Sequence, residues 1–484
     1  MSFAEEEDKN TKMKILFINP PFSKYSGVEG HGGKIAPLNL GYLASYVRQK
    51  KPEIEVGILD CEGLDLSYDQ IKEYIDKFKP DIAAITMPTP AYKHVIRVID
   101  VVKSLNDKTI IVIGGPHPTA LPKDILETEK NIDFAIIGEG ELTFLELVDF
   151  LENNNKDYHK IKGLVFRDQN KIIINELREL IQNLDSLPFP AKDLLPVHNY
   201  YLPPTKKITS GLSTNIVTSR GCPFNCTFCM AKTIWKRQTR FRSIKNVVDE
   251  IEECVKKYNH KDFGLHDEFF TVNKKRVIEF CDELKKRKLN IKWFCQARCG
   301  TVDREMLKIM KDAGCEKIGF GFESGDENIL RLMQKDNNLE KAKESVRLCK
   351  EAKINAGGSF ILGYPGETEE SLRKTIKFAK ELDPDIIAFF VAIPYPGTEL
   401  FRLAMEKNYI KKPINWEAFA PASNELPPME IPNISKERLL ELRKHAYRSF
   451  YLRPKYILRK LLNIRNIGDI KNLIQGFKIF QRLT

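Results

Sequence analysis

Three cysteines stand close together in the segment TSRGCPFNCTFCM, with the spacing C-x-x-x-C-x-x-C. They are Cys222, Cys226 and Cys229. Thiolates at such short spacing bind metal, but zinc sites and complete iron–sulfur sites normally use four protein ligands. No fourth cysteine or histidine lies close to them in the sequence. On a cubane [4Fe–4S] cluster, three thiolates would leave one iron open to chelation by the amino and carboxylate groups of a substrate.

The chain has ten cysteines, and its start indicates that they meet a reducing compartment. The first residues, MSFAEEEDKNTK, lack the basic and apolar parts of a secretory signal, and no apolar run approaches the roughly 20 residues that span a bilayer. We therefore expect a cytoplasmic protein, whose clustered thiols bind metal or react rather than form disulfides. Most of the seven scattered cysteines are expected to be small buried apolar residues.

The 484 residues are 42% hydrophobic and 30% charged. This length suffices for about two to four folded units, and the composition excludes a mainly disordered or collagen-like chain. The net charge is +11, from 77 Lys and Arg against 66 Asp and Glu. From residue 442 onward there are eleven Lys and Arg and a single acid, Asp469. Most of the positive charge therefore belongs to the C-terminal tail.

Residues 13–155 contain five short apolar runs rich in β-branched residues, each followed by turn residues and separated from the next by a helical pattern. This alternation predicts a doubly wound parallel sheet, whose ligands lie beyond the carboxyl ends of the strands. The turns lack the glycine fingerprint of a dinucleotide site, and the chain has no phosphate-binding loop. The pair Gly114 and Gly115 would let the backbone approach something broad and flat, although steric reasons alone also favour glycine in such turns.

Residues 206–400 contain six further strand candidates with helical patterns between them. This pattern predicts a partial (β/α)6 barrel of the TIM type, in which functional groups collect at the C-terminal ends of the strands. Polar residues follow these strands, and the candidates among them are His266, Asp267, Arg298, Glu323, Ser324 and Tyr395. Charged residues after strands are more often solvated or ion-paired, and a lone histidine is more often a structural donor, so each side chain also has a structural interpretation.

Three segments flank these modules. Residues 1–12 are predicted to be a disordered tail, and residues 156–205 a hairpin followed by a proline-rich linker. Residues 401–484 are predicted to be helical, and they end in a basic amphipathic tail. Such a helix suits the surface of an anionic bilayer, or it packs on the barrel with its charges in water. Nucleic acid is a weaker interpretation, because no recognition motif accompanies the charge.

Several runs resemble the cobalamin-binding (class B) radical S-adenosylmethionine enzymes. The cysteine spacing, with Phe228 just before the last cysteine, is the signature of the superfamily. The runs PLNLGYLASYV, IGGPHPTALP and IGEGE resemble the cobalamin-binding domain of this family. The runs FGFESG, GYPGETEES and PYPGTEL resemble counterparts in its barrel. The resemblance covers about residues 13–400.

The resemblance implies a [4Fe–4S] cluster on the three cysteines, with S-adenosylmethionine and cobalamin as further cofactors. It implies contacts to the adenosylmethionine from the barrel, with Arg298 at the carboxylate and Glu323 and Ser324 at the ribose or amino-acid part; the other candidates are Phe228 and Asp267. The implied catalytic candidates are His266, for proton transfer, and Tyr395, for contact with the substrate or for relay of a proton or an electron.

The resemblance also implies that residues at the strand ends of the first module bind cobalamin: Asn19, Pro20, Pro37, Leu38, Thr86, Gly114, Gly115, His117, Gly138 and Glu139. Many cobalamin proteins carry the motif D-x-H-x-x-G, but no histidine of this chain stands two residues after an aspartate. Either the corrin binds without a protein histidine under the cobalt, or the domain has lost its cofactor.

The implied reaction is reductive cleavage of S-adenosylmethionine to a 5′-deoxyadenosyl radical, followed by methyl transfer to an unactivated carbon of a small-molecule or lipid substrate. Two alternatives stay open: a cyclisation or rearrangement without net methylation, and an iron–sulfur electron-transfer protein without enzymatic activity. The expected partners are the substrate and an external one-electron reductant of the flavodoxin or ferredoxin type. Peripheral contact of the basic tail with the inner face of an anionic membrane is an alternative to packing of the tail on the barrel. Nucleic acid is not an expected partner.

Overall fold

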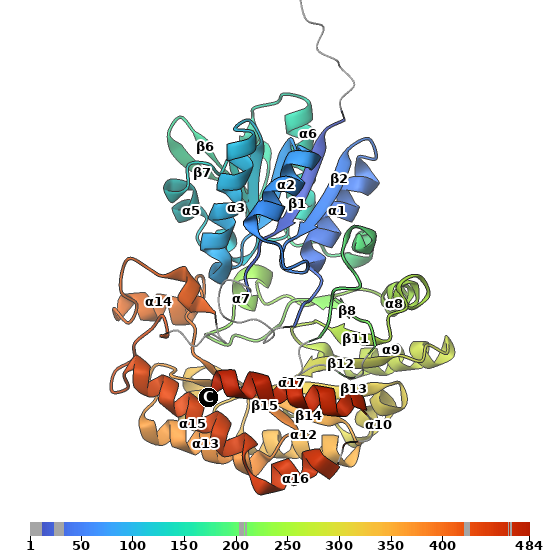
Figure 1. Ribbon diagram of the computed structural model, residues 1–484, viewed down its shortest axis with the longest axis vertical. Helices are drawn as coiled ribbons and strands as arrows, with labels where there is room; N and C mark the ends of the chain where they lie inside the picture. The colour runs from blue at the N-terminus through green and yellow to red at the C-terminus, as the bar shows by residue number, and fades with distance from the viewer. Residues whose placement is uncertain are drawn as a thin grey trace, which may run out of the picture. The chain divides into compact units, whose positions relative to one another are not determined.

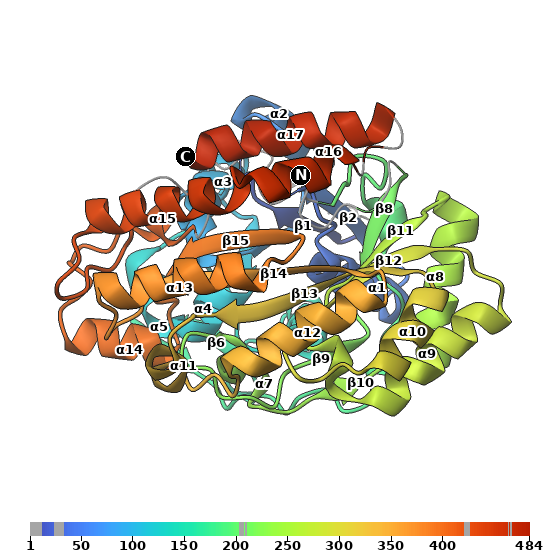
Figure 2. The same ribbon diagram turned by 90° about the horizontal axis from the view of Figure 1, so that it is seen from below.

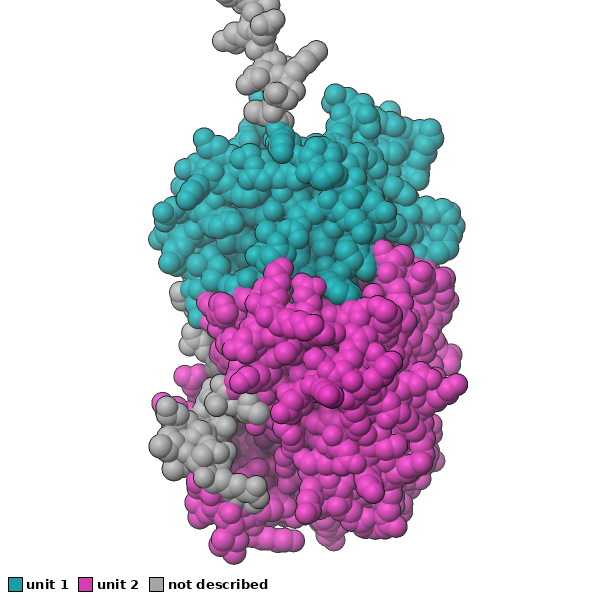
Figure 3. Space-filling model, turned by 90° about the vertical axis from the view of Figure 1, so that its right-hand side faces the viewer, with its two compact units in different colours: residues 1–21, 37–179, 187–196 teal, residues 22–36, 180–186, 197–484 magenta. Residues whose placement is uncertain are grey.

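The computed structural model describes two compact units, which Figure 3 shows in different colours. Unit 1 comprises residues 1–21, 37–179 and 187–196, and unit 2 comprises residues 22–36, 180–186 and 197–484. The described backbone covers residues 12–23, 33–202, 208, 211–420, 426–462, 464 and 467–484. The predicted disordered tail, residues 1–12, lies outside the described residues except for residue 12.

Unit 1 is built on a seven-stranded sheet in the order β2-β1-β3-β4-β5-β6-β7 (Figure 1). Strands β1 to β5 are parallel, and the hairpin β6–β7 adds to β5 antiparallel. The sequence pattern places this hairpin in the connector, residues 156–205, whereas in the structure it extends the sheet. The strand bounds are β1 (Lys14–Asn19), β2 (Glu55–Asp60), β3 (Ile82–Thr86), β4 (Ile110–Gly114), β5 (Phe134–Ile136), β6 (Leu164–Asp168) and β7 (Lys171–Ile174).

Helices connect the parallel strands of unit 1, as the sequence pattern predicts. Helix α1 packs beside α6 and α2 beside α3. The strand order reverses direction at β1, and crossovers between parallel strands are right-handed. The pair α1 and α6 therefore lies on one face of the sheet and the pair α2 and α3 on the other, which confirms the predicted doubly wound fold. The helix bounds are α1 (Leu38–Lys50), α2 (Tyr68–Phe78), α3 (Tyr92–Leu105), α4 (Pro116–Ala120), α5 (Pro122–Thr128) and α6 (Glu141–Glu152).

Unit 2 is built on a six-stranded parallel sheet in the order β15-β14-β13-β12-β11-β8. Each strand lies beside its neighbour in the chain, as in a (β/α) barrel, and β8 and β15 are its two edges. This arrangement confirms the predicted partial barrel. The strand bounds are β8 (Ser213–Ile216), β11 (Asp262–Leu265), β12 (Lys292–Ala297), β13 (Cys315–Glu323), β14 (Asn355–Leu362) and β15 (Ile386–Val391), with a separate small pair β9 (Ser219–Arg220) and β10 (Arg240–Phe241).

The helices of this barrel begin at polar side chains that accept hydrogen bonds from backbone N–H groups of the first turn. These caps are Ser243, Asn273, Asp303, Asn338 and Thr368. They follow the carboxyl ends of the strands, so each helix start is fixed at the end of the sheet where functional groups collect. The helix bounds are α7 (Ala231–Trp235), α8 (Ile244–Tyr258), α9 (Lys274–Lys286), α10 (Arg304–Asp312), α11 (Glu327–Leu332), α12 (Leu339–Glu351) and α13 (Glu369–Leu382).

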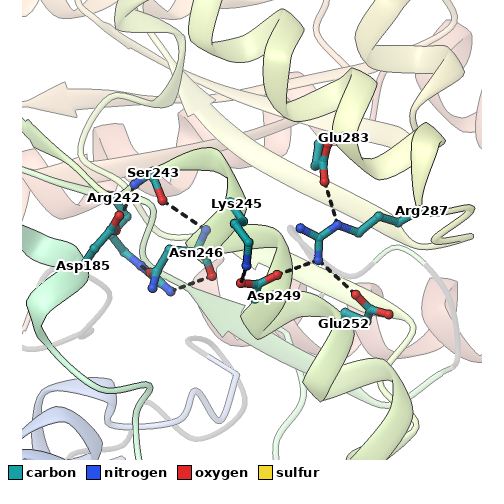
Figure 4. Close-up of polar contacts among 9 residues, drawn as sticks. All are labelled: Asp185, Arg242, Ser243, Lys245, Asn246, Asp249, Glu252, Glu283 and Arg287. Carbon is teal, nitrogen blue, oxygen red and sulfur yellow. Dashed lines mark hydrogen bonds and ion pairs between the residues drawn. The ribbon is translucent and has the colours of Figure 1, made fainter.

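Ion pairs tie α8 to its surroundings (Figure 4). Arg287, just after α9, binds Asp249 and Glu252 of α8 at 2.7 and 3.0 Å, and Glu283 of its own helix at 2.8 Å. The guanidinium of Arg242, just before α8, is buried against Glu250 at 2.5 Å. The buried pair therefore holds the start of α8 against β8, because Arg242 also donates to the carbonyl of Val217 at 2.8 Å.

The C-terminal part is helical, and it covers the open edge strand β15. Its helices are α14 (Glu399–Glu406), α15 (Lys436–Tyr451), α16 (Pro454–Leu462) and α17 (Ile467–Leu483). Figure 2 shows α15, α16 and α17 along one side of unit 2. Within the described ranges, no helix has both the length and the apolar character needed to cross a membrane.

Two tyrosines of α15 complete the hydrogen bonds of β15. The hydroxyl of Tyr451 accepts from the N–H of Ile387 at 2.9 Å and donates to its carbonyl at 2.6 Å. Tyr447 does the same for Phe389, at 3.0 and 3.2 Å. Four residues of helix rise about 6 Å and two residues of strand about 6.6 Å, so the two spacings match. The tyrosines thus replace the missing seventh strand at this edge.

We expect Tyr447→Phe to lower the free energy of unfolding by about 1–3 kcal/mol, because it leaves the buried N–H and carbonyl of Phe389 without their partner. Urea unfolding followed by circular dichroism measures this change. The half-exposed Tyr74 of α2 provides the control, because Tyr74→Phe removes a hydroxyl from the surface and should change the free energy by less than about 0.5 kcal/mol. Equal effects of the two substitutions would contradict the role given to Tyr447.

Candidate active site

The loop Cys222–Cys229 follows the first strand of the barrel. All three of its thiols are partly exposed, whereas the other seven cysteines are buried. The N–H of Cys229 donates to the carbonyl of Cys226 at 3.1 Å, which closes a tight turn between the last two thiols. The aromatic side chain of Phe228, in this turn, is partly buried against the core of unit 2. The chain thus presents three thiols on one short loop with a fixed turn.

Thr227, at the centre of this turn, is bound on three sides. Its N–H donates to the carbonyl of Met333 at 3.0 Å, and its carbonyl accepts from the N–H of Leu400 at 2.9 Å. Its hydroxyl lies 2.6 Å from the hydroxyl of Tyr364, which also donates to the carbonyl of Leu332 at 3.2 Å. Residues from three distant parts of the chain therefore fix the position of the cysteine loop.

The turn that carries Tyr364 is itself held by Glu367. One carboxylate oxygen, Oε2, accepts from the N–H groups of Gly363 and Tyr364 at 2.5 and 3.0 Å. The other oxygen, Oε1, is buried and has no hydrogen-bond partner within the described part of the chain. Burial raises the pKa of this carboxyl from 4.5 to about 8, so Glu367 is mostly neutral at pH 7. Gly363 has a φ of 84°, a conformation that favours glycine.

Asp267 and Glu268, at the end of β11, hold the two sides of the cysteine loop. Asp267 is buried and accepts from the N–H and hydroxyl of Thr218 at 2.7 and 2.5 Å, and from the hydroxyl of Ser219 at 2.7 Å. Glu268 accepts from the N–H of Gly221 at 3.1 Å and from the indole of Trp235 at 2.6 Å. Asp267 was predicted to contact a cofactor; in the structure its carboxylate binds the chain just before the loop.

Arg298, just after β12, lies against the cysteine loop. Its position at a strand end predicts a place near the functional site. Its guanidinium stacks on the ring of Phe224, 3.5 Å from the ring centroid, and Nη1 lies 3.7 Å from the sulfur of Cys226. Nη2 donates to the carbonyl of Asp336 at 2.7 Å. The side chain is buried, so a permanent positive charge sits beside the thiols.

Glu323, at the end of β13, forms a buried ion pair with Lys335 at 2.7 Å, with both side chains only 8% exposed. Its φ of 65° is in the left-handed region, where a bulge interrupts the pairing of β13 with β14. Such strain in a residue other than glycine is typical of functional sites. Burial disfavours the charge of Lys335, but Glu323 and the thiol of Cys226 outweigh this effect and raise its pKa. Lys335, which the sequence analysis missed, is thus a second cation near the cysteines.

The remaining barrel candidates bind other parts of the chain. The buried hydroxyl of Ser324 lies 3.1 Å from that of Thr375 and accepts from the N–H of Asp326. The hydroxyl of Tyr395 donates to the carbonyl of Phe419 at 3.0 Å. The ring of His266 is partly buried and packs edge-on against Phe294. The roles predicted for these three residues stay predictions.

The donor chemistry of the loop, three thiols within eight residues, fits an iron–sulfur cluster. Within the described residues, no group of three or more His, Cys, Asp or Glu side chains is arranged to hold one metal ion. In a cubane each thiolate binds a different iron, so the sulfurs do not need to converge on one point. Burial raises the pKa of the Cys222 thiol, and that of Cys229 to about 11, so binding of iron must displace protons from both.

The strand ends of unit 1 bring most of its predicted residues to one edge of the sheet, because β1, β3, β4 and β5 are parallel. Gly114 and Gly138 lie there with open space where a side chain would stand: a Cβ on Gly114 would meet only one atom, at 4.0 Å, and one on Gly138 would meet none within 4 Å. Gly115, by contrast, packs against Thr86 and Met87. Two of the three glycines therefore leave the backbone accessible to a flat ligand.

The other residues predicted for this edge differ in accessibility. Asn19 donates to Asp60 at 2.7 Å, and Thr86 accepts from Asn39 at 3.0 Å. His117 is 2% exposed and lies 3.2 Å from the hydroxyl of Thr89, and burial lowers its pKa to about 4. His117 is thus a neutral, buried residue beneath the edge. The partly exposed Pro37 precedes α1, and the buried candidates are Pro20, Leu38 and Glu139.

Two family models match the chain at these two places. The model of the radical SAM superfamily matches residues 216–379, from the end of β8 into α13. The model of the B12 binding domain matches residues 28–148, which include the strand ends of unit 1 from β2 to β5.

Relatives of known name match nearly the whole chain. An uncharacterized methyltransferase of Pyrococcus horikoshii is 37% identical over 96% of this chain and 98% of its own length. The anaerobic magnesium-protoporphyrin IX monomethyl ester cyclase of Rubrivivax gelatinosus is 30% identical over 92% of this chain and 78% of its own length. The solved structure of OxsB, a cobalamin-dependent S-adenosylmethionine radical enzyme, has a similar fold, with a TM-score of 0.75 at 18% identity over 97% of this chain and 71% of that chain.

The raised pKa of Glu367 predicts a pH dependence of stability. Between about pH 4.5 and 8 the folded protein keeps a proton that the unfolded chain releases, so the free energy of unfolding falls as the pH rises, by up to about 1.4 kcal/mol per pH unit for this group. Glu367→Gln keeps an oxygen for the two N–H groups and cannot ionise. Urea unfolding at several pH values should therefore show a flatter dependence for this variant.

The exposed Glu370, in the first turn of α13, provides the control for this measurement. Glu370→Gln should leave the slope of the wild-type protein unchanged. Parallel curves for the wild type and Glu367→Gln would show that Glu367 is ionised in the folded protein, against this prediction.

The contact of Tyr364 with Thr227 is testable by a double-mutant cycle. We expect Tyr364→Phe to lower the free energy of unfolding by about 1–3 kcal/mol, since it also leaves the carbonyl of Leu332 without its donor. Thr227→Val removes the other hydroxyl at nearly constant volume. The two changes should be coupled by about 0.5–1.5 kcal/mol, and iodoacetamide should modify the three loop cysteines faster in either variant than in the wild type. Additive effects with unchanged alkylation rates would mean that this contact does not fix the loop.

Proposed function

Because this chain belongs to the cobalamin-binding radical S-adenosylmethionine enzymes, we propose that it transfers a methyl group to an unactivated carbon of a small-molecule or lipid substrate. The observation that carries the proposal is the loop of three partly exposed thiols, held from several sides and flanked by two buried cations. The similarity to a methyltransferase over nearly the full length of both chains supports the type of reaction.

Cys222, Cys226 and Cys229 would hold the cluster, and the strand ends of unit 1 would hold the corrin. A [4Fe–4S] cluster bound here supplies the electron that cleaves S-adenosylmethionine to a 5′-deoxyadenosyl radical, and cobalamin supplies the methyl carrier. The contribution of the chain is to orient these groups and to keep water from the radical. An external one-electron reductant, of the flavodoxin or ferredoxin type, must supply the electron.

The cations near the loop, Arg298 and Lys335, would stabilise the negative charge of a bound cluster. Binding of a cluster turns three thiols into thiolates and adds negative charge to a partly buried site. Arg298 lies next to Cys226, and Lys335 lies close enough for its pKa to respond to the same thiol. Both cations favour the thiolate state, so they stabilise the loaded loop. Arg298 would also be available to the carboxylate of S-adenosylmethionine, as the family resemblance implies.

A second candidate reaction is ring closure or rearrangement without net methylation. The 30% identity to a magnesium-protoporphyrin IX monomethyl ester cyclase over 92% of this chain supports it. Both reactions would begin with the same radical, and they differ in whether the product gains a carbon atom.

The experiment that tests the proposal compares the wild type with the variant Cys222→Ala/Cys226→Ala/Cys229→Ala. We expect anaerobically reconstituted wild type to bind about four irons per chain, as one [4Fe–4S] cluster requires. With dithionite and S-adenosylmethionine it should form 5′-deoxyadenosine. The triple variant should lose both iron and product. Cys254→Ala, a change of a buried cysteine in α8, provides the control and should keep both. With methyl-labelled S-adenosylmethionine and extracts of the source cells, label in a product distinguishes methyl transfer from cyclisation.

Three results would contradict the proposal. The first is formation of 5′-deoxyadenosine by the triple variant, which would place the chemistry elsewhere. The second is a cluster whose spectrum does not change when S-adenosylmethionine is added, as expected of an electron-transfer protein with four protein ligands. The third is a reconstituted wild type that binds no cobalamin.

A further inference from the structure

Exposed apolar side chains are concentrated in the C-terminal helices of unit 2. Among the described residues, fifteen large hydrophobic side chains are exposed, and eight of these lie within residues 452–477. Scattered exposed apolar residues are normal, but a concentration of this kind marks a binding surface. The eight residues are Leu452, Ile457, Leu458, Leu461, Leu462, Leu473, Ile474 and Phe477, and we refer to them as the apolar tail surface.

Helix α16 turns its apolar side away from the barrel. Ile457, Leu458, Leu461 and Leu462 are spaced i, i+1, i+4 and i+5, so they share one side of the helix. Leu458 is 58% and Leu462 75% exposed. Helices on a soluble core show the opposite arrangement, with the apolar side inward. The contacts on the inner side of α16 show why its apolar side is exposed.

Charged and aromatic residues fix the inner side of α16. Arg459 binds Asp383 at 3.1 Å, and Arg453, just before the helix, binds the same carboxylate at 2.9 Å. Between them the ring of Tyr456 is buried, and its hydroxyl donates to the carbonyl of Asp385 at 3.1 Å. Rotating the leucines inward would break these contacts, so the outward side of α16 stays exposed in the folded protein.

Helix α17 shows the same division along its described side chains. Phe480 packs edge-on against Tyr451, and Leu483 is buried, so this side of the helix faces α15. Leu473, Ile474 and Phe477 are exposed. Their spacing i, i+1 and i+4 puts them on one side, as in α16.

The charge around the apolar tail surface indicates its partner. Residues 452–484 contain eight Lys and Arg and one acidic residue. Arg453 and Arg459 bind Asp383 on the inner side. The side chain of Lys455 is 83% exposed although its ammonium lies 3.5 Å from the same carboxylate, and Lys478 is exposed as well. Leucines, isoleucines and a phenylalanine among exposed lysines, on helices too short to span a bilayer, are the pattern of a helix that lies in the interface of an anionic membrane.

We propose that the outward sides of α16 and α17 bind the surface of an anionic phospholipid bilayer, with the apolar tail surface among the acyl chains and the lysines at the lipid phosphates. A second copy of the chain fits this surface less well, because two such tails would bring like charges together. The bilayer, by contrast, offers both an apolar interior and negative charge. This inference does not depend on the reaction that the barrel catalyses.

Co-sedimentation of the full-length protein with lipid vesicles tests the proposal. We expect binding to vesicles of phosphatidylcholine that contain about one third phosphatidylglycerol, weaker binding to phosphatidylcholine alone, and weaker binding at ~0.5 M than at ~0.1 M salt. Leu458→Glu/Leu462→Glu should reduce the partition coefficient on the order of tenfold or more, and Ile474→Glu/Phe477→Glu should act in the same direction. These side chains are exposed, so circular dichroism and thermal unfolding should remain those of the wild type.

Leu177→Glu provides the matched control, because Leu177 of unit 1 is also exposed, at 47%, but lies outside the tail. It should bind vesicles as the wild type does. The proposal is wrong if the wild type does not sediment with anionic vesicles, or if well-folded tail variants sediment as the wild type does. It is also wrong if sedimentation velocity shows a wild-type dimer that the tail variants dissociate, since the surface would then be occupied by a second copy.

Discussion

The site depends on one constraint, which is that a loop of eight residues, Cys222 to Cys229, must hold three sulfur atoms in place. Within the loop, the turn between Cys226 and Cys229 is closed by a single backbone hydrogen bond. Its rigidity comes from outside, through Thr227, which the ends of distant segments bind by backbone and side chain. Asp267 binds the chain just before the loop in the same way. The barrel thus provides the loop with partners from segments just after β11 and β14, and from the end of α11 and the start of α14.

The charges around the loop follow from the same arrangement. Thiolates in a partly buried site need cations nearby, and a buried cation needs an anion of its own. Glu323 pairs with Lys335 and so lets a buried ammonium persist near the thiols, while Arg298 is stabilised by stacking on Phe224. A buried ion pair contributes little net stability, because burying the two charges costs free energy. The pair Glu323–Lys335 is therefore better explained by the positive charge that it places beside the cysteines.

The sequence predicted the elements well because they depend on local patterns: apolar runs of strand length and their alternation with helices. The cysteine loop is local too, since its three thiols stand within eight residues, and the cluster they would hold stays a prediction. The sequence did not predict which strand-end side chains contact the cysteine loop and which bind other segments of the barrel. Ser324 and Tyr395 were predicted at strand ends, but their hydroxyls bind Thr375 and a backbone carbonyl. Lys335 lies between α11 and α12, where the sequence gives no signal, and it pairs with Glu323 at the bulge of β13. Such contacts depend on residues far apart in the chain, and a single sequence does not contain them.

An incomplete barrel has an exposed edge, and this edge explains the C-terminal helices. The N–H and carbonyl groups of β15 would be open to pairing with another chain. Tyr447 and Tyr451 bind these groups, which requires α15 to lie along the strand with its tyrosines inward. Asp383, just before β15, then receives the arginines of the next helix, so the side of α16 that faces the barrel is occupied by charge. Its leucines have no remaining place inside the unit. The exposed apolar tail surface is therefore a consequence of how the barrel edge is covered, and the same residues that protect the sheet also determine which side of the tail is free to bind.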